Sequence, residues 1–104
     1  MNSNKYALRF TETFRKDLHH IIHYILYKLK NPIAASNLNK LIEKKINDRL
    51  VSPTVSETFK SSKKRKNIYY KIHIKNYIVF YIVKDNVMEV RRILYNKRAL
   101  EKLL

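Results

Sequence analysis

Two polar residues in the second half of this sequence, Lys71 and His73, have the types and spacing needed for acid–base chemistry. They lie in a segment that alternates apolar and polar residues, and positions i and i+2 of a strand project from the same face. His73 has an unperturbed pKa suited to proton transfer near neutral pH. The same spacing also describes two exposed polar positions on an ordinary strand, and spacing alone favours that second interpretation.

Basic residues also crowd the end of the chain, where the stretch VRRILYNKR begins at Val90. Lys97 and Arg98 could hold a phosphate group. Tyr95 and Tyr69 could stack on unpaired bases, or they could close the end of a sheet core, which is the more frequent use of tyrosine there.

Strand alternation predicts that Arg91 and Arg92 point to opposite faces, so both cannot serve one site. For one of them we expect an ion pair with Glu89 or a solvated position.

Further candidate nucleic-acid contacts lie in a basic run and a turn. They are Lys63, Lys64, Arg65, Lys66 and Lys75. The run could clamp a nucleic-acid backbone without reading its sequence, or it could simply be a solvated loop.

The charge balance favours an anionic partner. The 104 residues contain 23 Lys and Arg against 8 Asp and Glu, a net charge of +15. Self-repulsion of this size costs stability, so nucleic acid, a ribosome or an acidic protein is the expected partner. No apolar run reaches the roughly 18 residues of a membrane span, and the polar start at Met1 lacks a signal peptide's apolar region. We expect no membrane partner and a cytoplasmic location.

Composition also excludes several kinds of site. The sequence has no cysteine and no glycine, which removes zinc–thiolate sites and the glycine-rich nucleotide-binding loops, so no cofactor is expected. His19, His20 and His23 suggest a metal site, but Asp17 is the only nearby carboxylate. We expect surface or packing histidines and no metal.

The first half of the chain reads as a strand and two helices. Alternation predicts a strand over 5–10, and Thr11 can cap the helix that follows. One apolar stripe runs through that helix, at Phe14, Leu18, Ile21, Ile22, Ile25, Leu26 and Leu29. Pro32 predicts the first turn of a second helix, with Asn31 as its cap.

The second half reads as a loop followed by strands. Residues 52–67 lack a period and are expected to form an exposed loop. Three strands are predicted over 68–75, 77–83 and 87–95, of which the second is apolar on both faces and therefore central. A short helix is predicted over 99–104. The expected fold is α+β, with the order β-α-α-β-β-β, an antiparallel sheet packed on an N-terminal helical hairpin, and one domain over 1–104.

This order, the Pro-x-Ala-Ala that starts at Pro32, the strand NYIVFYIV over 76–83 and the ending RRILYNKR over 91–98 resemble the RelE/ParE superfamily of bacterial type II toxins. The resemblance implies either a RelE-like mRNA interferase acting in the ribosome or a ParE-like protein that poisons DNA gyrase without nuclease activity. It also implies a cognate acidic antitoxin.

Transferring the RelE-type site gives a mixed match. Lys71 and His73 match its two basic strand residues, of which the second is lysine in the best-known pattern, and Arg98 matches its final arginine. An expected arginine falls at Ile78, and an expected tyrosine falls near Leu104, for which Tyr95 could substitute.

Two hypotheses therefore remain. The first is a ribosome-dependent endoribonuclease that uses Lys71, His73, Tyr95 and Arg98, with Arg91, Arg92 and Lys97 among its nucleic-acid contacts, and we lean narrowly to it. The second is a gyrase inhibitor acting through the helical hairpin over 14–50. A toxin that has lost its activity is a third possibility.

Overall fold

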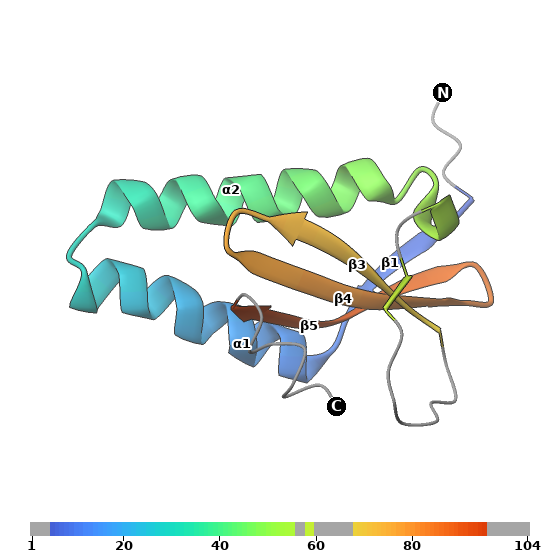
Figure 1. The fold of residues 1–104 in the computed structure, drawn as a ribbon, viewed down its shortest axis with the longest axis horizontal. Coiled ribbons are helices and arrows are strands. Elements are labelled where there is room, and N and C mark those ends of the chain that lie inside the picture. The colour runs from blue at the N-terminus through green and yellow to red at the C-terminus, as the bar shows by residue number, and fades with distance from the viewer. Residues whose placement is uncertain (1–4, 56–57, 60–67, 96–104) are drawn as a thin grey trace.

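A computed structural model describes residues 5–55, 58–59 and 68–95 of the chain. In Figure 1 two antiparallel helices join at one end of the molecule, and a twisted sheet lies against them. In the described residues the sheet has five strands, in the order β1 (Ala7–Phe10), β5 (Val87–Tyr95), β4 (Tyr77–Lys84), β3 (Tyr69–Ile74) and β2 (Thr58–Phe59). The predicted α+β fold with a helical hairpin and a sheet is confirmed.

The first helix, α1, spans Glu12–His23. Thr11 caps it as predicted, because its hydroxyl accepts a hydrogen bond from the backbone N–H of Phe14 at 3.1 Å. The helix then widens into a π-helical turn, η1, over Tyr24–Lys28. The sequence did not indicate this change of period.

The second helix, α2, spans Pro32–Arg49. Asn31 caps it as predicted and accepts a hydrogen bond from the N–H of Ala34 at 3.0 Å. Pro32 occupies the first turn, where its missing N–H costs nothing.

The strands agree with the predicted segments, except that β2 lies within the predicted loop over 52–67. They are β1 Ala7–Phe10, β2 Thr58–Phe59, β3 Tyr69–Ile74, β4 Tyr77–Lys84 and β5 Val87–Tyr95. β4 lies in the middle of the sheet, as its two apolar faces predicted. The expectation of a purely antiparallel sheet was wrong, because β1 pairs with β5 in parallel.

The helices cover one face of the sheet, and the main core forms there. It includes Ile42 and Ile46 of α2 and Val79 and Tyr81 of β4, all nearly or fully inaccessible to solvent. The expected apolar stripe of the first helix holds except at its end, because Leu29 is 56% exposed. The π-helical turn before Leu29 changes the direction in which later side chains point.

The chain makes its tight turns without glycine. Between β3 and β4, Lys75 has a φ of 53°, and between β4 and β5, Asp85 and Asn86 have φ values of 53° and 62°. Asp and Asn tolerate this left-handed conformation better than other residues with a side chain. The two turns lie where the sequence predicted them.

The predicted loop over 52–67 is partly ordered, which corrects that expectation. Pro53–Val55 form a single 3-10 turn, and Pro53 is buried. The short strand β2 adds to the edge of β3. The basic run over 63–66 and the predicted helix over 99–104 lie outside the described residues.

Candidate functional site: the second face of the sheet

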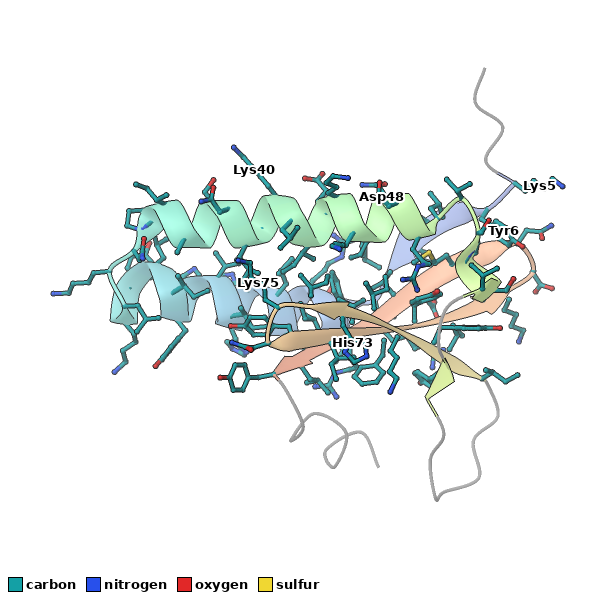
Figure 2. The ribbon with its side chains drawn as sticks, turned by 45° about the horizontal axis from the view of Figure 1, so that its top comes forward. Lys5, Tyr6, Lys40, Asp48, His73 and Lys75 are labelled. Atoms are coloured by element: carbon teal, nitrogen blue, oxygen red, sulfur yellow. The ribbon has the colours of Figure 1, made fainter. Side chains whose placement is uncertain are left out.

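The face of the sheet that points away from the helices carries most of the candidate site residues that the structure describes, and we call it the second face. It is formed by Tyr69, Lys71 and His73 of β3, by Ile78, Phe80 and Ile82 of β4, and by Glu89, Arg91, Arg92 and Leu94 of β5. Figure 2 shows His73 projecting from the side of the sheet away from α2. Lys71 and His73 therefore share one surface, as their spacing predicted.

Residues that lie opposite one another on neighbouring strands form two rows across the second face, one through Lys71 and one through His73. Lys71 lies opposite Phe80 of β4, and Phe80 lies opposite Arg92 of β5. Because directly opposed residues project from the same side of a sheet, Lys71 and Arg92 flank the buried Phe80 ring. The next row places His73 beside Ile78.

The second face is apolar at its centre. Ile78 and Phe80 are buried, with Tyr69 and Leu94 packed against them. The position at which the RelE-type pattern expects an arginine is thus occupied by a buried aliphatic side chain, so it supplies no cation beside His73.

A bulge in β5 determines which of its side chains reach this face. Val90 lies opposite Tyr81 and Arg92 lies opposite Phe80, so Arg91 is an extra residue on its strand. One extra residue reverses the alternation beyond it. The prediction that Arg91 and Arg92 point to opposite faces was therefore wrong.

Arg91 is held by two partners on the second face. Its Nε donates to Glu89 at 2.9 Å and its Nη1 donates to the Tyr69 hydroxyl at 3.0 Å. The guanidinium carbon also lies 5.9 Å from the centre of the Tyr69 ring. Partial burial opposes the charge, but the bonds to Tyr69 and Glu89 outweigh it and raise the pKa of Arg91. The expected ion pair with Glu89 is confirmed.

Arg92 is neutralised by the first helix. Its Nε and Nη2 donate to the two carboxylate oxygens of Asp17 at 2.8 and 3.1 Å. These bonds raise the pKa of Arg92. Asp17 also accepts the backbone N–H of Ile93 at 3.1 Å, so one carboxylate joins α1 to the edge of β5.

Tyr95 lies on the other side of the sheet from Lys71 and His73. It is opposite Tyr77, and their rings meet edge to face at 5.4 Å. Tyr77 packs against the main core beneath the helices. Without the bulge, Tyr95 would have shared the face of Glu89, so the bulge separates it from the other predicted catalytic residues.

The remaining candidates divide into two groups. Lys75 is exposed in the turn between β3 and β4 (Figure 2). Lys63, Lys64, Arg65, Lys66, Lys97 and Arg98 lie outside the described residues.

At its other end the second face is hollowed into a mixed-charge cleft of about 470 Å³, lined partly by Arg9, Lys84, Glu89 and Arg91. Glu89 lies between two arginines there, with Arg9 Nε at 3.4 Å and Arg91 Nε at 2.9 Å. From the sequence, Glu89 was expected to form an ion pair with only one arginine, Arg91 or Arg92. The cleft is less cationic than a count of its basic residues implies.

Two of the histidines of α1 form a row of ring contacts with Tyr27 on the helix surface. The rings of His19 and His23 lie 3.8 Å apart, and Tyr27 follows His23 at 5.0 Å. Within the described ranges, no group of three or more His, Cys, Asp or Glu side chains could hold a metal ion.

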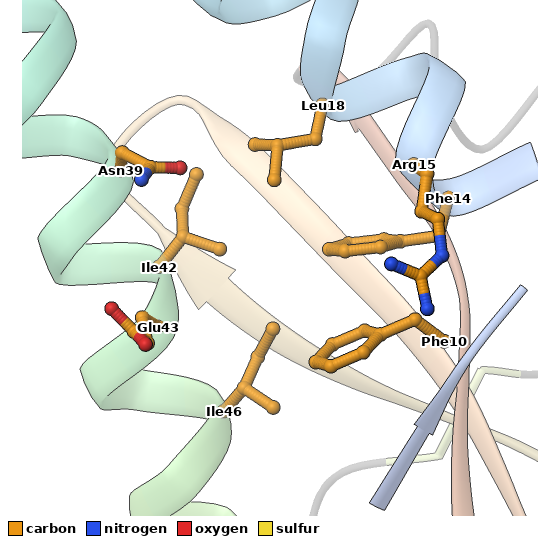
Figure 3. A pocket seen from close by; sticks show the side chains of 8 residues that line it. All are labelled: Phe10, Phe14, Arg15, Leu18, Asn39, Ile42, Glu43 and Ile46. Carbon is orange, nitrogen blue, oxygen red and sulfur yellow. The ribbon is translucent and has the colours of Figure 1, made fainter. Parts of the chain in front are cut away.

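An apolar groove separates α1 from α2 (Figure 3). Its cavity of about 240 Å³ is lined by Phe10, Phe14, Arg15, Leu18, Asn39, Ile42, Glu43 and Ile46. The two phenylalanine rings are stacked 5.3 Å apart, and the Arg15 guanidinium carbon lies 5.7 Å from the centre of the Phe10 ring. The groove is thus apolar at its base and carries one basic and one acidic residue on its rim.

None of the helices in the described ranges is both long enough and apolar enough to cross a membrane.

The fold is that of toxins in known toxin–antitoxin structures. One similar structure is the chromosomal ParDE TA system from P. aeruginosa, with a TM-score of 0.71 and 16% identity over 91% of this chain and 100% of that one. The RelBE2 toxin–antitoxin complex from Mycobacterium tuberculosis gives a TM-score of 0.59 and 19% identity over 88% and 91%. The RelB–RelE complex from Methanococcus jannaschii gives 0.51 and 24% over 92% and 99%. A search of curated proteins by sequence gives no match.

The family is shown by sequence. A model of the ParE toxin of the type II toxin–antitoxin system parDE matches residues 8–100. The chain therefore belongs to the ParE toxin family, and the resemblance to RelE/ParE toxins is confirmed.

Proposed function

We propose that this toxin acts in the cytoplasm as a non-nuclease inhibitor of DNA gyrase, the activity that resemblance to the ParE branch implies. The sequence alone favoured a ribonuclease narrowly, and this proposal prefers the gyrase inhibitor instead. Membership of the ParE toxin family supports the gyrase target.

The placement of Tyr95 is the observation that carries the proposal. An RNase needs a base, an acid and cationic donors within reach of one phosphate. Lys71 and His73 lie on the second face, whereas Tyr95 lies beneath the helices against Tyr77. Across the described residues, the proposed acid–base set is split by the sheet.

The neutralised arginines support the same conclusion. Arg91 and Arg92 each have a carboxylate partner within 2.9 Å, from Glu89 and Asp17. The negative charge of each carboxylate would repel a phosphate that approaches the remaining N–H groups of the guanidinium, which weakens its binding.

An mRNA interferase is the second candidate. The shared face of Lys71 and His73, with Arg92 in the row of Lys71, favours it. Arg98 would complete this site as a phosphate ligand. The basic run over 63–66 and Lys97 would contact the RNA backbone, and the partners would be the ribosome and mRNA.

Two assays on one preparation separate these candidates. We expect the protein to inhibit supercoiling by purified gyrase and to leave the message intact in a cell-free translation reaction. The double variant Lys71→Ala/His73→Ala should inhibit gyrase as strongly as the unchanged protein. Cleaved message with unimpaired supercoiling would overturn the proposal, and loss of that cleavage in the double variant would establish the second candidate.

We also propose that a cognate acidic antitoxin binds this toxin. The net charge of +15 calls for an anionic partner when the toxin is idle. The groove between α1 and α2 offers an apolar base for an amphipathic segment, which fits an antitoxin that orders as it binds (Figure 3).

A stabilisation assay tests the antitoxin proposal. A partner that binds only the folded toxin raises the melting temperature with its concentration. We expect Arg15→Ala, at the exposed rim of the groove, to weaken this effect more than Lys40→Ala, which removes the same charge from an exposed residue outside the groove lining. Equal effects from the two variants would exclude the groove as the docking site.

A further inference from the structure

A third cavity, distinct from the mixed-charge cleft and from the groove, lies where the hairpin tip meets the end of the sheet. It has a volume of about 660 Å³, within the range of small-ligand pockets. Its walls include His20, Tyr24, Asn31, Asn76, Tyr77 and Tyr95, and we call it the tyrosine pocket. In Figure 1 the tip of the hairpin, the turn between β3 and β4 and the end of β5 lie towards the same side of the molecule.

The pocket presents aromatic rings that remain accessible. Tyr24 and Tyr95 are 55% and 52% exposed, although both rings are large and apolar. Tyr77 meets Tyr95 edge to face and fixes one wall. Exposed aromatic clusters of this kind mark binding sites on small proteins.

Two side-chain amides in the pocket, beside the His20 imidazole and the tyrosine hydroxyls, can form hydrogen bonds with a ligand. The Asn31 side-chain oxygen caps α2, which leaves its NH2 group to donate. Asn76 lies in the turn that precedes β4. Among the described residues, the lining contains no lysine, arginine or carboxylate.

Three basic residues flank the lining residues along the chain. Lys28, Lys30 and Lys75 are exposed and adjoin the lining residues in sequence. No acidic residue occurs between Asp17 and Glu43, the segment that forms the hairpin tip. A ligand that fits has a flat neutral part with hydrogen-bonding edges and an anionic part that stays outside.

We propose that the tyrosine pocket binds an unpaired nucleobase of a single-stranded nucleic acid, with the adjoining phosphates near Lys28, Lys30 and Lys75. Aromatic stacking combined with a cationic margin is the general way in which proteins hold single strands. A base in a duplex is not available for such stacking. This activity is additional to the inhibition of gyrase.

Fluorescence anisotropy with the full chain tests the proposal. The probes are labelled 12-mers of dT and of U, and a 12-base-pair duplex, each at two salt concentrations. The variants Tyr24→Leu and Tyr95→Leu keep the charge and remove one ring. Tyr27→Leu is the matched control, because Tyr27 is 64% exposed, lies with its ring tilted against that of His23 and is outside the pocket lining.

We expect each pocket variant to bind single strands about tenfold more weakly, in the range found for base–aromatic stacking. Duplex affinity and the salt dependence should stay the same, because both are governed by phosphate contacts. Loss on dT, on U or on both identifies DNA, RNA or either as the ligand.

Unchanged single-strand binding in Tyr24→Leu, or an equal loss on single strands and duplex, would overturn the proposal. An equal loss in Tyr27→Leu would do the same. Tyr24 is largely exposed, so its variant tests the pocket even if Tyr95→Leu lowers stability. The supercoiling assay is independent of all these measurements.

Discussion

The contact between α1 and β5 offers a quantitative test of how this fold is held together. Asp17 accepts two hydrogen bonds from Arg92 and one from the backbone N–H of Ile93. The Asp17 side chain is 14% exposed and that of Arg92 is 31% exposed. The substitution Asp17→Asn keeps the size of the side chain and removes its charge.

The expected cost is about 2–3 kcal/mol in the free energy of unfolding. A hydrogen bond to a charged group contributes about 1.5–3 kcal/mol, and the variant leaves a half-buried guanidinium without its carboxylate. For a domain of this size, about 1 kcal/mol corresponds to a melting shift of about 4–8 °C. The melting temperature of Asp17→Asn should therefore fall by about 10 °C or more.

Asp48→Asn is the matched control for this prediction. Asp48 pairs with Lys44 at 2.9 Å, but the two side chains are 61% and 70% exposed. An exposed pair one helical turn apart contributes about 0.3–0.5 kcal/mol. Thermal and urea denaturation followed by circular dichroism measure both variants. If Asp17→Asn costs no more than Asp48→Asn, the carboxylate does not join α1 to β5 in the way described.

Two further predictions concern the partly buried Tyr77 and the fully buried Tyr81. Burial, with the hydroxyls of Tyr95 and Tyr24 nearby, raises the pKa of Tyr77 above that of an unfolded tyrosine, about 10. The free energy of unfolding should therefore stay constant up to about pH 10 and fall as the pH rises through the folded pKa of Tyr77. Urea denaturation at several pH values between about 8 and 11 measures this fall, and Tyr77→Phe should reduce it. The fully buried Tyr81 donates its hydroxyl hydrogen to the Pro53 carbonyl, so Tyr81→Phe should cost about 1–3 kcal/mol by the same denaturation assay. A stability unchanged by Tyr81→Phe would mean that another donor replaces the hydroxyl.

Much of the local structure follows from residue type and spacing. Thr11 and Asn31 cap their helices because their side-chain oxygens reach N–H groups three residues ahead. Asp85 and Asn86 turn the chain without glycine for a similarly local reason. The two apolar faces of β4 indicated a central strand, which the sheet order confirms.

The pairing of the first strand could not be read from the sequence. β1 and β5 are far apart in the chain and lie in parallel. Alternation indicates which residues of a strand are buried, but it carries no information on the partner or its direction. That choice depends on how the helical hairpin returns the chain across the sheet.

The candidate site shows the same division between local and tertiary information. The sequence by itself determined that Lys71 and His73 share a face, because both lie in one regular strand. Only the tertiary structure decided that Tyr95 lies on the opposite face. The cause is the bulge at Arg91, where the spacing of buried residues lengthens from two, between Met88 and Val90, to three before Ile93. Alternation holds only while each residue has one partner, and a single extra residue reverses every side chain beyond it.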